Sequence, residues 1–178
     1  VPTPIDKLAE KIGKAAAIQI AEKGFKVILG CRNMERGQHA MEDIKTASGS
    51  DALELLQIDM ASKDSISKAA SDLKKGNSVL DVLIHNAADF DISRKEAVLS
   101  PDGIETVWAT NHIGPVHLTH LLLDMMKKSE QGRILTVASK GLLMHPNLKI
   151  DHEDPEFKKK AFSVSKAYYH SKLAQVMY

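Results

Sequence analysis

Short apolar runs alternate with amphipathic stretches along the chain, and this alternation constrains the fold more than any other feature. Runs rich in β-formers lie at residues 25–29, 52–60, 80–88 and 132–139. Helical patterns occupy residues 15–24, 62–75, 102–128 and the stretch from about Ser163 onwards. Strands that are apolar throughout and joined through helices form parallel sheets covered on both faces. The sequence therefore predicts a doubly wound (Rossmann-like) α/β fold, with a ligand at the carboxyl ends of the strands.

Length and charge narrow the class of protein. The 178 residues are enough for one domain, spanning 1–178, and too few for two ordinary ones. With 24 basic and 23 acidic residues the net charge is +1, which favours neither nucleic acid nor an anionic membrane as a partner. The single cysteine, Cys31, excludes an internal disulfide and fits a reducing intracellular compartment. A membrane anchor outside these residues is left open.

The segment "AYYHSKLAQVMY" poses the question of which tyrosine is placed for chemistry. Positions four apart share one face of a helix, so Tyr168 faces Lys172 whereas Tyr169 faces Leu173. A nearby ammonium favours the phenolate and should lower the pKa of Tyr168. The alternative interpretation is that Tyr168 and Lys172 form a pair on the protein surface, with Tyr168 only partly packed. We expect Tyr169 to pack against Leu173 and Val176.

Six segments occur in order along the chain: "ILGCRNMERG", "QIDM", "VLIHNAA", "ATNHIG", "RILTVASK" and "AYYHSKLAQ". Together they resemble the short-chain dehydrogenase/reductase family, in its retinol-dehydrogenase-like branch, from about Ile12 to the last residue. The resemblance implies four catalytic residues, Asn111, Ser139, Tyr168 and Lys172. It also implies cofactor-binding residues: Ile12, Gly13, Arg32, Asn33, Asp59, Met60, Asn86 and Ala87, together with Tyr168 and Lys172.

The roles implied by this resemblance follow the chemistry of hydride transfer. Tyr168 would be the general acid in reduction and the general base in oxidation, and Lys172 would lower its pKa and hold the nicotinamide ribose. Ser139 would hydrogen-bond the substrate oxygen. Asn111 would leave its carbonyl free, at a helix kink before Pro115, for a water that links Lys172 to solvent. Taken singly, Ser139 could simply end a strand and Asn111 satisfy a broken helix.

Residues that follow the first predicted strand bear on the cofactor. A carboxylate at this point selects NAD through the ribose 2′-OH, whereas arginine accommodates the 2′-phosphate of NADP. Here the strand runs into Arg32, Arg36 follows, and Glu35 is the first acid. The planar guanidinium suits phosphate oxygens, which favours NADP(H) over NAD(H). The plainer interpretation is a solvated arginine.

The opening of the chain departs from the family pattern. Alignment on Ile12 and Gly13 puts Lys7 and Lys11 where the first two glycines of the phosphate turn belong, and no apolar run precedes them. Ala88 also replaces the last glycine after Ala87. Either a strand and glycine turn are missing before Ile12, which is our expectation, or the protein has lost its phosphate loop. Family members continue past the Tyr-Lys helix with another strand, so we also expect the sheet to be incomplete at its C-terminal side.

Two functions of different classes remain. The first is an NADP-dependent oxidoreductase acting on an apolar alcohol or carbonyl compound such as a retinoid, steroid or lipid aldehyde, with the long helix available for a homodimer. The second is a catalytically silent Rossmann-like module that acts through protein contacts, motivated by the lysines at glycine positions. His117 and His120 lie three residues apart, but no acid or cysteine completes a metal site.

Overall fold

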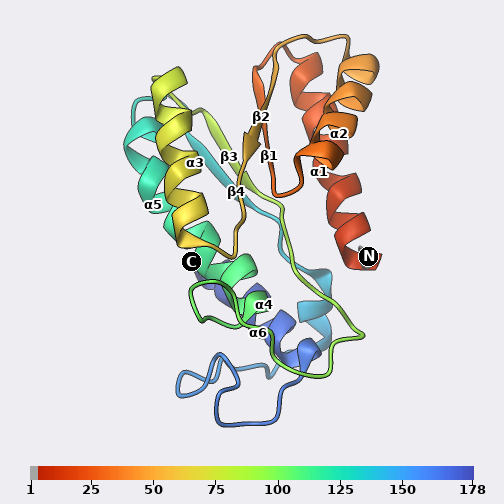
Figure 1. The fold of residues 1–178 in the computed structure, drawn as a ribbon, viewed down its shortest axis with the longest axis vertical. Helices are drawn as coiled ribbons and strands as arrows, with labels where there is room; N and C mark the ends of the chain where they lie inside the picture. The colour runs from red at the N-terminus through yellow and green to blue at the C-terminus, as the bar shows by residue number, and fades with distance from the viewer. Residues whose placement is uncertain (1–3) are drawn as a thin grey trace.

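Helices and strands alternate along the chain in the computed structural model, which describes residues 4–178 (Figure 1). The strands are β1 (Val27–Cys31), β2 (Leu53–Gln57), β3 (Val82–His85) and β4 (Arg133–Thr136). The α-helices are α1 (Pro4–Glu22), α2 (Met34–Ser48), α3 (Lys63–Gly76), α4 (Thr106–Trp108), α5 (Gly114–Met126) and α6 (Val164–Met177). A π-helical turn, η1 (Ala109–Ile113), and a 3₁₀ helix, η2 (Lys140–Met144), complete the order. The predicted α/β class is confirmed.

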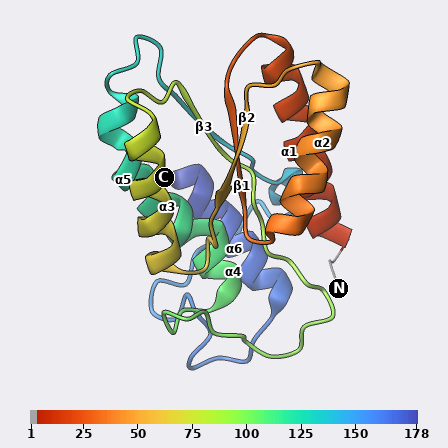
Figure 2. The ribbon, with the colours of Figure 1, turned by 45° about the horizontal axis from the view of Figure 1, so that its top comes forward.

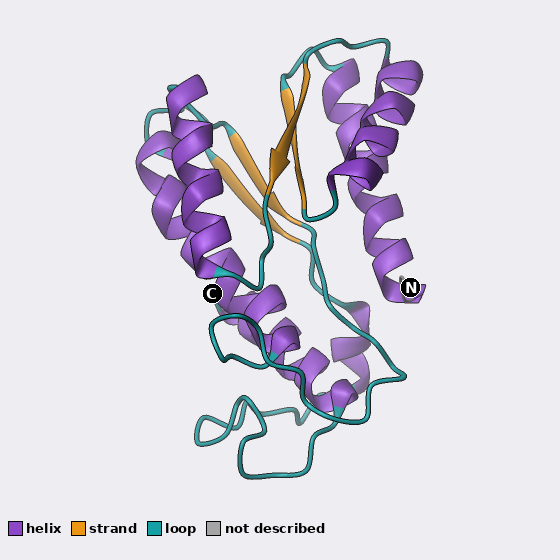
Figure 3. Cartoon of the chain, in the orientation of Figure 1, coloured by secondary structure: helices purple, strands orange, loops and turns teal. Residues whose placement is uncertain are grey.

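The strands form two parallel pairs rather than one sheet. β1 pairs with β2, Val27 opposite Leu53, and β3 pairs with β4, Val82 opposite Arg133. No ladder of hydrogen bonds joins β1 to β3 among the described residues, and the two pairs are separate in Figure 3. The residues before β1 form a helix and supply no strand to bridge the pairs, which agrees with the absence of an apolar run before Ile12.

The two sides of the strands bury their residues against different helices. On β1, Val27 and Leu29 pack with Leu53 against Ala17 of α1 and Ile44 of α2. The alternate β1 residue, Ile28, points the other way and packs in a second cluster with side chains of α3 and α5, among them Ile66, Leu73 and Leu122. Figures 1 and 2 show the same arrangement, with α1 and α2 on one side and α3 and α5 on the other. This period-two alternation covers both faces, as predicted.

Local capping explains where several helices begin and end. The Ser62 side chain accepts a hydrogen bond from the Ser65 amide at the start of α3, and the Ser163 hydroxyl accepts one from the Lys166 amide at the start of α6. Gly24 has φ +83° just after α1, a left-handed conformation that favours glycine and ends the helix as predicted. Within the described helices, none is both long enough and apolar enough to cross a bilayer.

The long helix predicted over residues 102–128 is shorter and broken. It starts at Thr106 and passes through the π-helical turn η1 before α5 begins at Gly114. Pro115 has no amide hydrogen to donate to the carbonyl of Asn111 four residues earlier, which accounts for the irregularity at the predicted place. A carbonyl of Asn111 left free for water stays a prediction.

Candidate active site

Polar residues follow the carboxyl end of each strand. Arg32 comes directly after β1, Asp59 two residues after β2, Asn86 directly after β3, and Ser139 three residues after β4. Parallel strands within a pair present their carboxyl ends at one edge. Each pair of strands therefore brings two of the predicted site residues to the same edge.

Tyr168 lies on the buried face of α6 with Lys172 one turn later. The Tyr168 side chain is 7% exposed, in an apolar cluster with Val107, Ala167 and the Phe90 ring, whose centroid is 4.5 Å from that of Tyr168. The Lys172 ammonium is 5.8 Å from the Tyr168 ring centroid. Ser139, at the end of the loop after β4, lies near enough to the Tyr168 hydroxyl to lower its pKa. Three of the four predicted catalytic residues, Ser139, Tyr168 and Lys172, thus lie near one another.

The pKa of Tyr168 moves in the opposite direction to our prediction. Burial raises it above its ordinary value of 10.0, and the Ser139 side chain opposes this rise only in part. Lys172 is not among the groups that shift it, so the predicted lowering by the ammonium is wrong. At neutral pH, Tyr168 is a protonated phenol, which suits a proton donor.

Burial also acts on Lys172, which is 2% exposed. Its Nζ donates hydrogen bonds to the Val137 carbonyl, 2.9 Å away at the end of β4, and to Oε1 of Gln175, 2.8 Å away. Desolvation lowers the pKa of Lys172 from 10.5 to about 8, since its charged form loses water contacts. Lys172 is therefore still mostly charged at pH 7.

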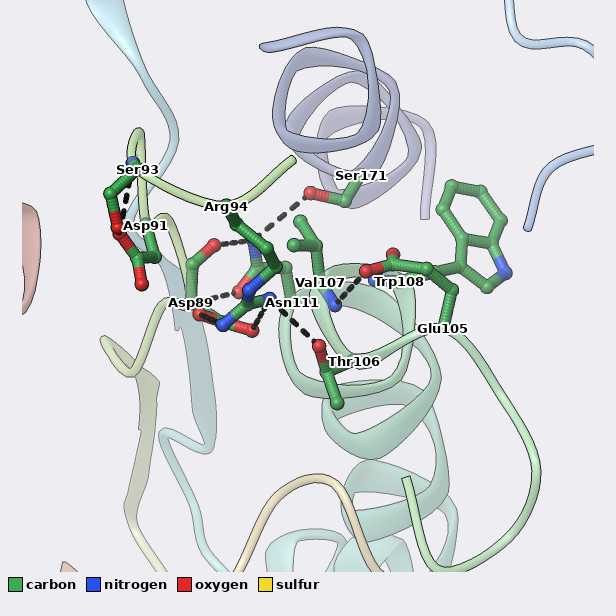
Figure 4. A network of polar contacts seen from close by, with 10 residues as sticks. All are labelled: Asp89, Asp91, Ser93, Arg94, Glu105, Thr106, Val107, Trp108, Asn111 and Ser171. Carbon is green, nitrogen blue, oxygen red and sulfur yellow. Dashed lines mark hydrogen bonds and ion pairs between the residues drawn. The ribbon is translucent and has the colours of Figure 1, made fainter. Parts of the chain in front are cut away.

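Asn111 is fully buried in η1, and its side chain joins three segments of the chain (Figure 4). Its Oδ1 accepts a hydrogen bond from the Asp89 amide (2.7 Å), and its Nδ2 donates to the Asp89 carbonyl (3.0 Å) and to Oγ of Ser171 (3.0 Å). The Ser171 hydroxyl in turn donates to the Tyr168 carbonyl at 2.7 Å. The Asn111 side chain thus fixes the loop after β3 to the helix that carries Tyr168 and Lys172.

An ion pair and a buried cap hold the same loop from the other side (Figure 4). Arg94 binds both carboxylate oxygens of Asp89, at 3.0 and 3.2 Å, and donates to Oγ1 of Thr106 at 2.8 Å. Glu105 caps α4 by accepting hydrogen bonds from the amides of Val107 and Trp108, each at 3.0 Å. Burial raises the pKa of Glu105, while these two amide hydrogen bonds oppose the rise. The sequence reasoning missed this network.

Tyr169 turns away from Lys172, as the helical spacing predicted. Its ring lies 4.4 Å from that of His145, centroid to centroid, and against Gly141 of η2. Val176, which we expected to cover Tyr169, is exposed. Tyr169 therefore packs on η2 after Ser139 and beside Tyr168, not on Val176.

The end of β1 leaves an arginine exposed for an anionic group. Arg32 is exposed, and no side chain among the described residues hydrogen-bonds it. Asn33 caps α2 by accepting a hydrogen bond from the Arg36 amide at 2.9 Å, and the Arg36 guanidinium pairs with Glu10. After β2, Oδ1 of Asp59 accepts a hydrogen bond from the Ala61 amide at 2.9 Å. The Arg32 guanidinium at this end is thus open to an anionic group, and its predicted contact with the cofactor stays a prediction.

Close packing also marks the residues after β2. The Met60 carbonyl lies so near α5 that a Cβ on Gly114 would come within 2.2 Å of it. Met60 thereby fixes the loop after β2 against the start of α5. Its predicted contact with the cofactor stays a prediction.

The residues expected at the pyrophosphate do not form a turn. Ile12 and Gly13 lie inside the uninterrupted helix α1, and Lys7 and Lys11 are helical too. Nδ2 of Asn86 donates to the Ala9 carbonyl at 2.9 Å, and a Cβ on Gly13 would lie 2.7 Å from the same Nδ2. An amide inside a helix is already bonded, so Gly13 offers no free N–H to a phosphate. Ile12 and Gly13 therefore do not form the phosphate turn that the sequence resemblance implied.

Asn86 and Ala87 differ in how far they are exposed. Oδ1 of Asn86 is buried without a hydrogen-bond partner among the described residues, while Ala87 after it is exposed. Helix α1 passes through Ile12 without interruption. The strand and glycine turn that we expect to be missing before Ile12 stay a prediction. The Asn86 atom that faces α1 is Nδ2 and not the unpaired Oδ1.

The two histidines of α5 do not converge on a common point. Nε2 of His117 lies 3.3 Å from Oγ of Ser67, and Nδ1 of His120 lies 2.8 Å from the Val116 carbonyl of its own helix. Within the described part of the chain, no three histidine, cysteine or carboxylate side chains gather in a way that could hold a metal ion. The two side chains serve local packing and hydrogen bonding.

Comparison with known proteins decides the family. The short chain dehydrogenase family matches residues 8–149 of this chain. Mouse retinol dehydrogenase 13 is 35% identical over 167 residues, which cover 94% of this chain and 48% of that protein. The bovine dehydrogenase/reductase SDR family member 13 is 34% identical, with 94% of this chain and 42% of that protein covered. The chain belongs to the short-chain dehydrogenase/reductase family of oxidoreductases.

Solved structures agree with the fold of this family. An uncharacterised protein from Mycobacterium paratuberculosis superimposes with a TM-score of 0.77 at 30% identity, covering 93% of this chain and 55% of that one. A metagenomic short-chain oxidoreductase in complex with NADP has a TM-score of 0.70 at 22% identity, covering 95% of this chain and 69% of that one. The chain spans about half the length of the retinol dehydrogenase and SDR relatives described above.

Within this short-chain dehydrogenase/reductase chain, several supporting residues escaped the sequence reasoning. Ser171 lies in the quoted "YYHSK" segment, so its proximity to Asn111 has a local signal. Asp89 and Arg94 carry none, because their link to Asn111 and Thr106 depends on how the loop after β3 folds back. Because these residues lie far apart in the sequence, their contacts could not be predicted from it.

Proposed function

We propose that this chain carries the proton-transfer centre of an NADP(H)-dependent oxidoreductase that acts on an apolar alcohol or carbonyl compound. The observation that supports it is the convergence of Ser139, Tyr168 and Lys172 beside the end of β4. Tyr168 would transfer a proton to or from the substrate oxygen, and the Ser139 hydroxyl would hydrogen-bond the same oxygen. The nicotinamide, when bound, supplies or accepts the hydride.

Tyr168 is a phenol at neutral pH and carries the proton that carbonyl reduction consumes, whereas alcohol oxidation needs its phenolate. Burial makes this phenolate costly in whichever direction it forms, so the raised pKa does not by itself set a working direction.

Apolar side chains around Tyr168 and Ser139 support the substrate class. Phe90 packs on the Tyr168 ring, and η2, which begins directly after Ser139, exposes 74% of Leu143 and 80% of Met144. Exposed large apolar side chains next to a reactive group suit an apolar ligand. Among its relatives, those named retinol dehydrogenase agree with an apolar alcohol or aldehyde such as a retinoid. A steroid or lipid aldehyde fits the same chemistry.

The choice of NADP(H) over NAD(H) is supported by Arg32. It lies at the end of β1, where a cofactor ribose meets this fold, and no carboxylate precedes Glu35 in the segment that follows the strand. A structural relative that superimposes with a TM-score of 0.70 holds NADP. Both observations agree with a 2′-phosphate at this position.

Replacing Tyr168 with phenylalanine tests the proposal. NADPH-dependent reduction of retinal and of other apolar aldehydes should fall at least ~10²–10⁴-fold, the usual contribution of general acid–base catalysis, with NADPH affinity nearly intact. Tyr169→Phe is the matched control and should stay close to the unchanged chain, since its hydroxyl lies on η2. Equal losses in the two variants would refute the assigned role of Tyr168.

A second candidate, a silent Rossmann-like module acting through protein contacts, is favoured by α1. This helix stands where the phosphate turn was expected, so Ile12 and Gly13 offer no free amide to a pyrophosphate. Titration with NADPH and with NADH, followed by cofactor fluorescence, separates the two candidates. Saturable binding that is tighter for NADPH supports the oxidoreductase, and an absence of binding for both supports the silent module.

A further inference from the structure

Lys172 holds a buried charge without a counter-ion among the described residues. Its two hydrogen-bond acceptors, the Val137 carbonyl and Oε1 of Gln175, are both neutral oxygens. Tyr168 is the titratable group that faces it, with 5.8 Å between the ammonium and the ring centroid. The position of the ammonium therefore depends on one fixed backbone oxygen and one side chain.

Gln175 is a costly residue to bury for packing alone. It is 5% exposed, three residues after Lys172 on α6, and its Nε2 has no hydrogen-bond partner among the described residues. A buried donor without a partner costs about 1–3 kcal/mol, which an apolar side chain of similar size would avoid. The hydrogen bond that Gln175 accepts from Lys172 is thus the contact that accounts for an amide here.

We propose that Gln175 is a positioning residue that holds the Lys172 ammonium beside Tyr168 with a neutral acceptor. This inference rests on the proposed function, because it concerns the same proton-transfer site. A carboxylate in place of the amide would form a buried ion pair, draw the ammonium toward itself and favour its charged form. An apolar side chain would leave the ammonium with the Val137 carbonyl alone. The amide keeps Lys172 in place while leaving its charge unpaired.

Two substitutions of opposite effect test this role. In Gln175→Glu the proton affinity of Lys172 should rise at least tenfold, because a charge of opposite sign at hydrogen-bond distance shifts a pKa by about 1–3. In Gln175→Met the proton affinity should fall, since the ammonium loses an acceptor. Gln131→Glu makes the same change of charge at an exposed position before β4 and should leave Lys172 unchanged.

The readout is the titration of Lys172 itself, followed by NMR of the chain with ¹³Cε-labelled lysine. The Lys172 signal is identified by its loss in Lys172→Met, and the exposed Lys166 on the same helix gives an internal reference. Urea unfolding of Gln175→Met reports the net effect of removing the unpaired Nε2 and of taking an acceptor from Lys172, so the titration rather than the stability decides the role. A purely packing role would change stability and leave the Lys172 titration where it was.

Activity provides a separate test of the proposed function. The pH at which aldehyde reduction declines should move with the Lys172 titration in each variant, with little change in KM for the aldehyde. Shifted titrations in a chain that reduces no apolar aldehyde would support the positioning role and overturn the proposed function. Identical Lys172 titrations in the unchanged chain and in both Gln175 variants would overturn the positioning role. If Gln175→Glu does not fold, the Lys172 titration in Gln175→Met alone tests this role.

Discussion

Replacing His85 with asparagine should remove a loss of stability that the unchanged chain suffers in mild acid. His85 ends β3, its side chain is buried, and its Nε2 lies 2.8 Å from Oγ1 of Thr119 on α5. Burial lowers the pKa of His85 from 6.5 to about 4, because the imidazolium would lose its hydration. Asparagine can keep a hydrogen bond with Thr119 and does not titrate in this range.

The sign and size of the effect follow from linkage. Between pH 6.5 and about 4 the unfolded chain binds more protons at His85 than the folded chain does. Its contribution to stability is therefore complete above pH 6.5 and is lost as the pH falls through this window. Each pH unit of difference between the two pKa values corresponds to about 1.4 kcal/mol, so the loss should be about 2 kcal/mol at pH 5 and about 3 kcal/mol at pH 4.

Urea unfolding at pH 7.5, 6, 5 and 4.5 measures this loss. The fluorescence of Trp108, the one tryptophan of the chain, reports unfolding. The free energy of unfolding of the unchanged chain should fall by about 2 kcal/mol more than that of His85→Asn between pH 7.5 and 5. Burial also lowers the pKa of His112 and of His170, and since both residues stay in the variant, their contributions cancel in the difference.

A matched substitution at the exposed His152 serves as the control, and its pH dependence should follow that of the unchanged chain. If His85→Asn loses as much free energy on acidification as the unchanged chain, water reaches His85 in the folded state. The reasoning from burial would then be refuted.

Three further predictions concern the cofactor site, the packing and the buried lysine. Arg32→Ala should weaken NADPH binding by roughly 1.5–3 kcal/mol and leave NADH binding unchanged in fluorescence titrations, and an equal loss for both would make Arg32 a folding residue. Gly114→Ala should lower the free energy of urea unfolding by about 1–3 kcal/mol, because its Cβ would meet the Met60 carbonyl at 2.2 Å, whereas Gly76→Ala, with open space around it, should not. In the folded chain the pKa of Lys172 is about 8, below its ordinary value of 10.5, so the free energy of unfolding should rise by about 3 kcal/mol as the pH rises from 8 to 10.5. Lys172→Met should lack this rise. An equal dependence of the free energy of unfolding on pH in both proteins would contradict a buried ammonium.

Helical spacing was sufficient to predict which of the two tyrosines lies beside Lys172. Tyr168 and Lys172 are buried on one face of α6, and Tyr169 turns to η2, as the four-residue period required. The serine caps of α3 and α6 and the left-handed Gly24 were equally predictable, because a cap depends on neighbours within a few residues. Local geometry of this kind can be predicted from the sequence.

The pKa of Tyr168 was not predictable in the same way. The sequence shows that a lysine lies one turn away, which argues for a lowered pKa, but it does not show that Phe90 and Val107 enclose the ring. These two residues come from the loop after β3 and from α4, far from α6 in sequence. Desolvation by them outweighs the effect expected from the lysine.

For the first residues of the chain, the sequence predicted only that they depart from the family pattern. The lysines and prolines before Ile12 indicated that no strand or glycine turn forms, yet not that α1 would extend through these residues. The split between β1 and β3 follows from this helix. Helix α2 was missed altogether, although Asn33 caps its start and the left-handed Gly49 ends it.

The proton-transfer centre and the pyrophosphate end of the candidate site depend on different parts of the chain. A substitution can therefore disturb one without disturbing the other. Asn111 joins Asp89 to Ser171, and Lys172 is held by Val137 and Gln175, with no contribution from α1. The pyrophosphate end, in contrast, is set by α1 against Asn86. A change within α1 should therefore alter the dissociation constant of the cofactor without moving Tyr168 or the titration of Lys172. Loss of cofactor binding together with an unchanged Lys172 titration would assign the defect to the helix rather than to the proton-transfer centre.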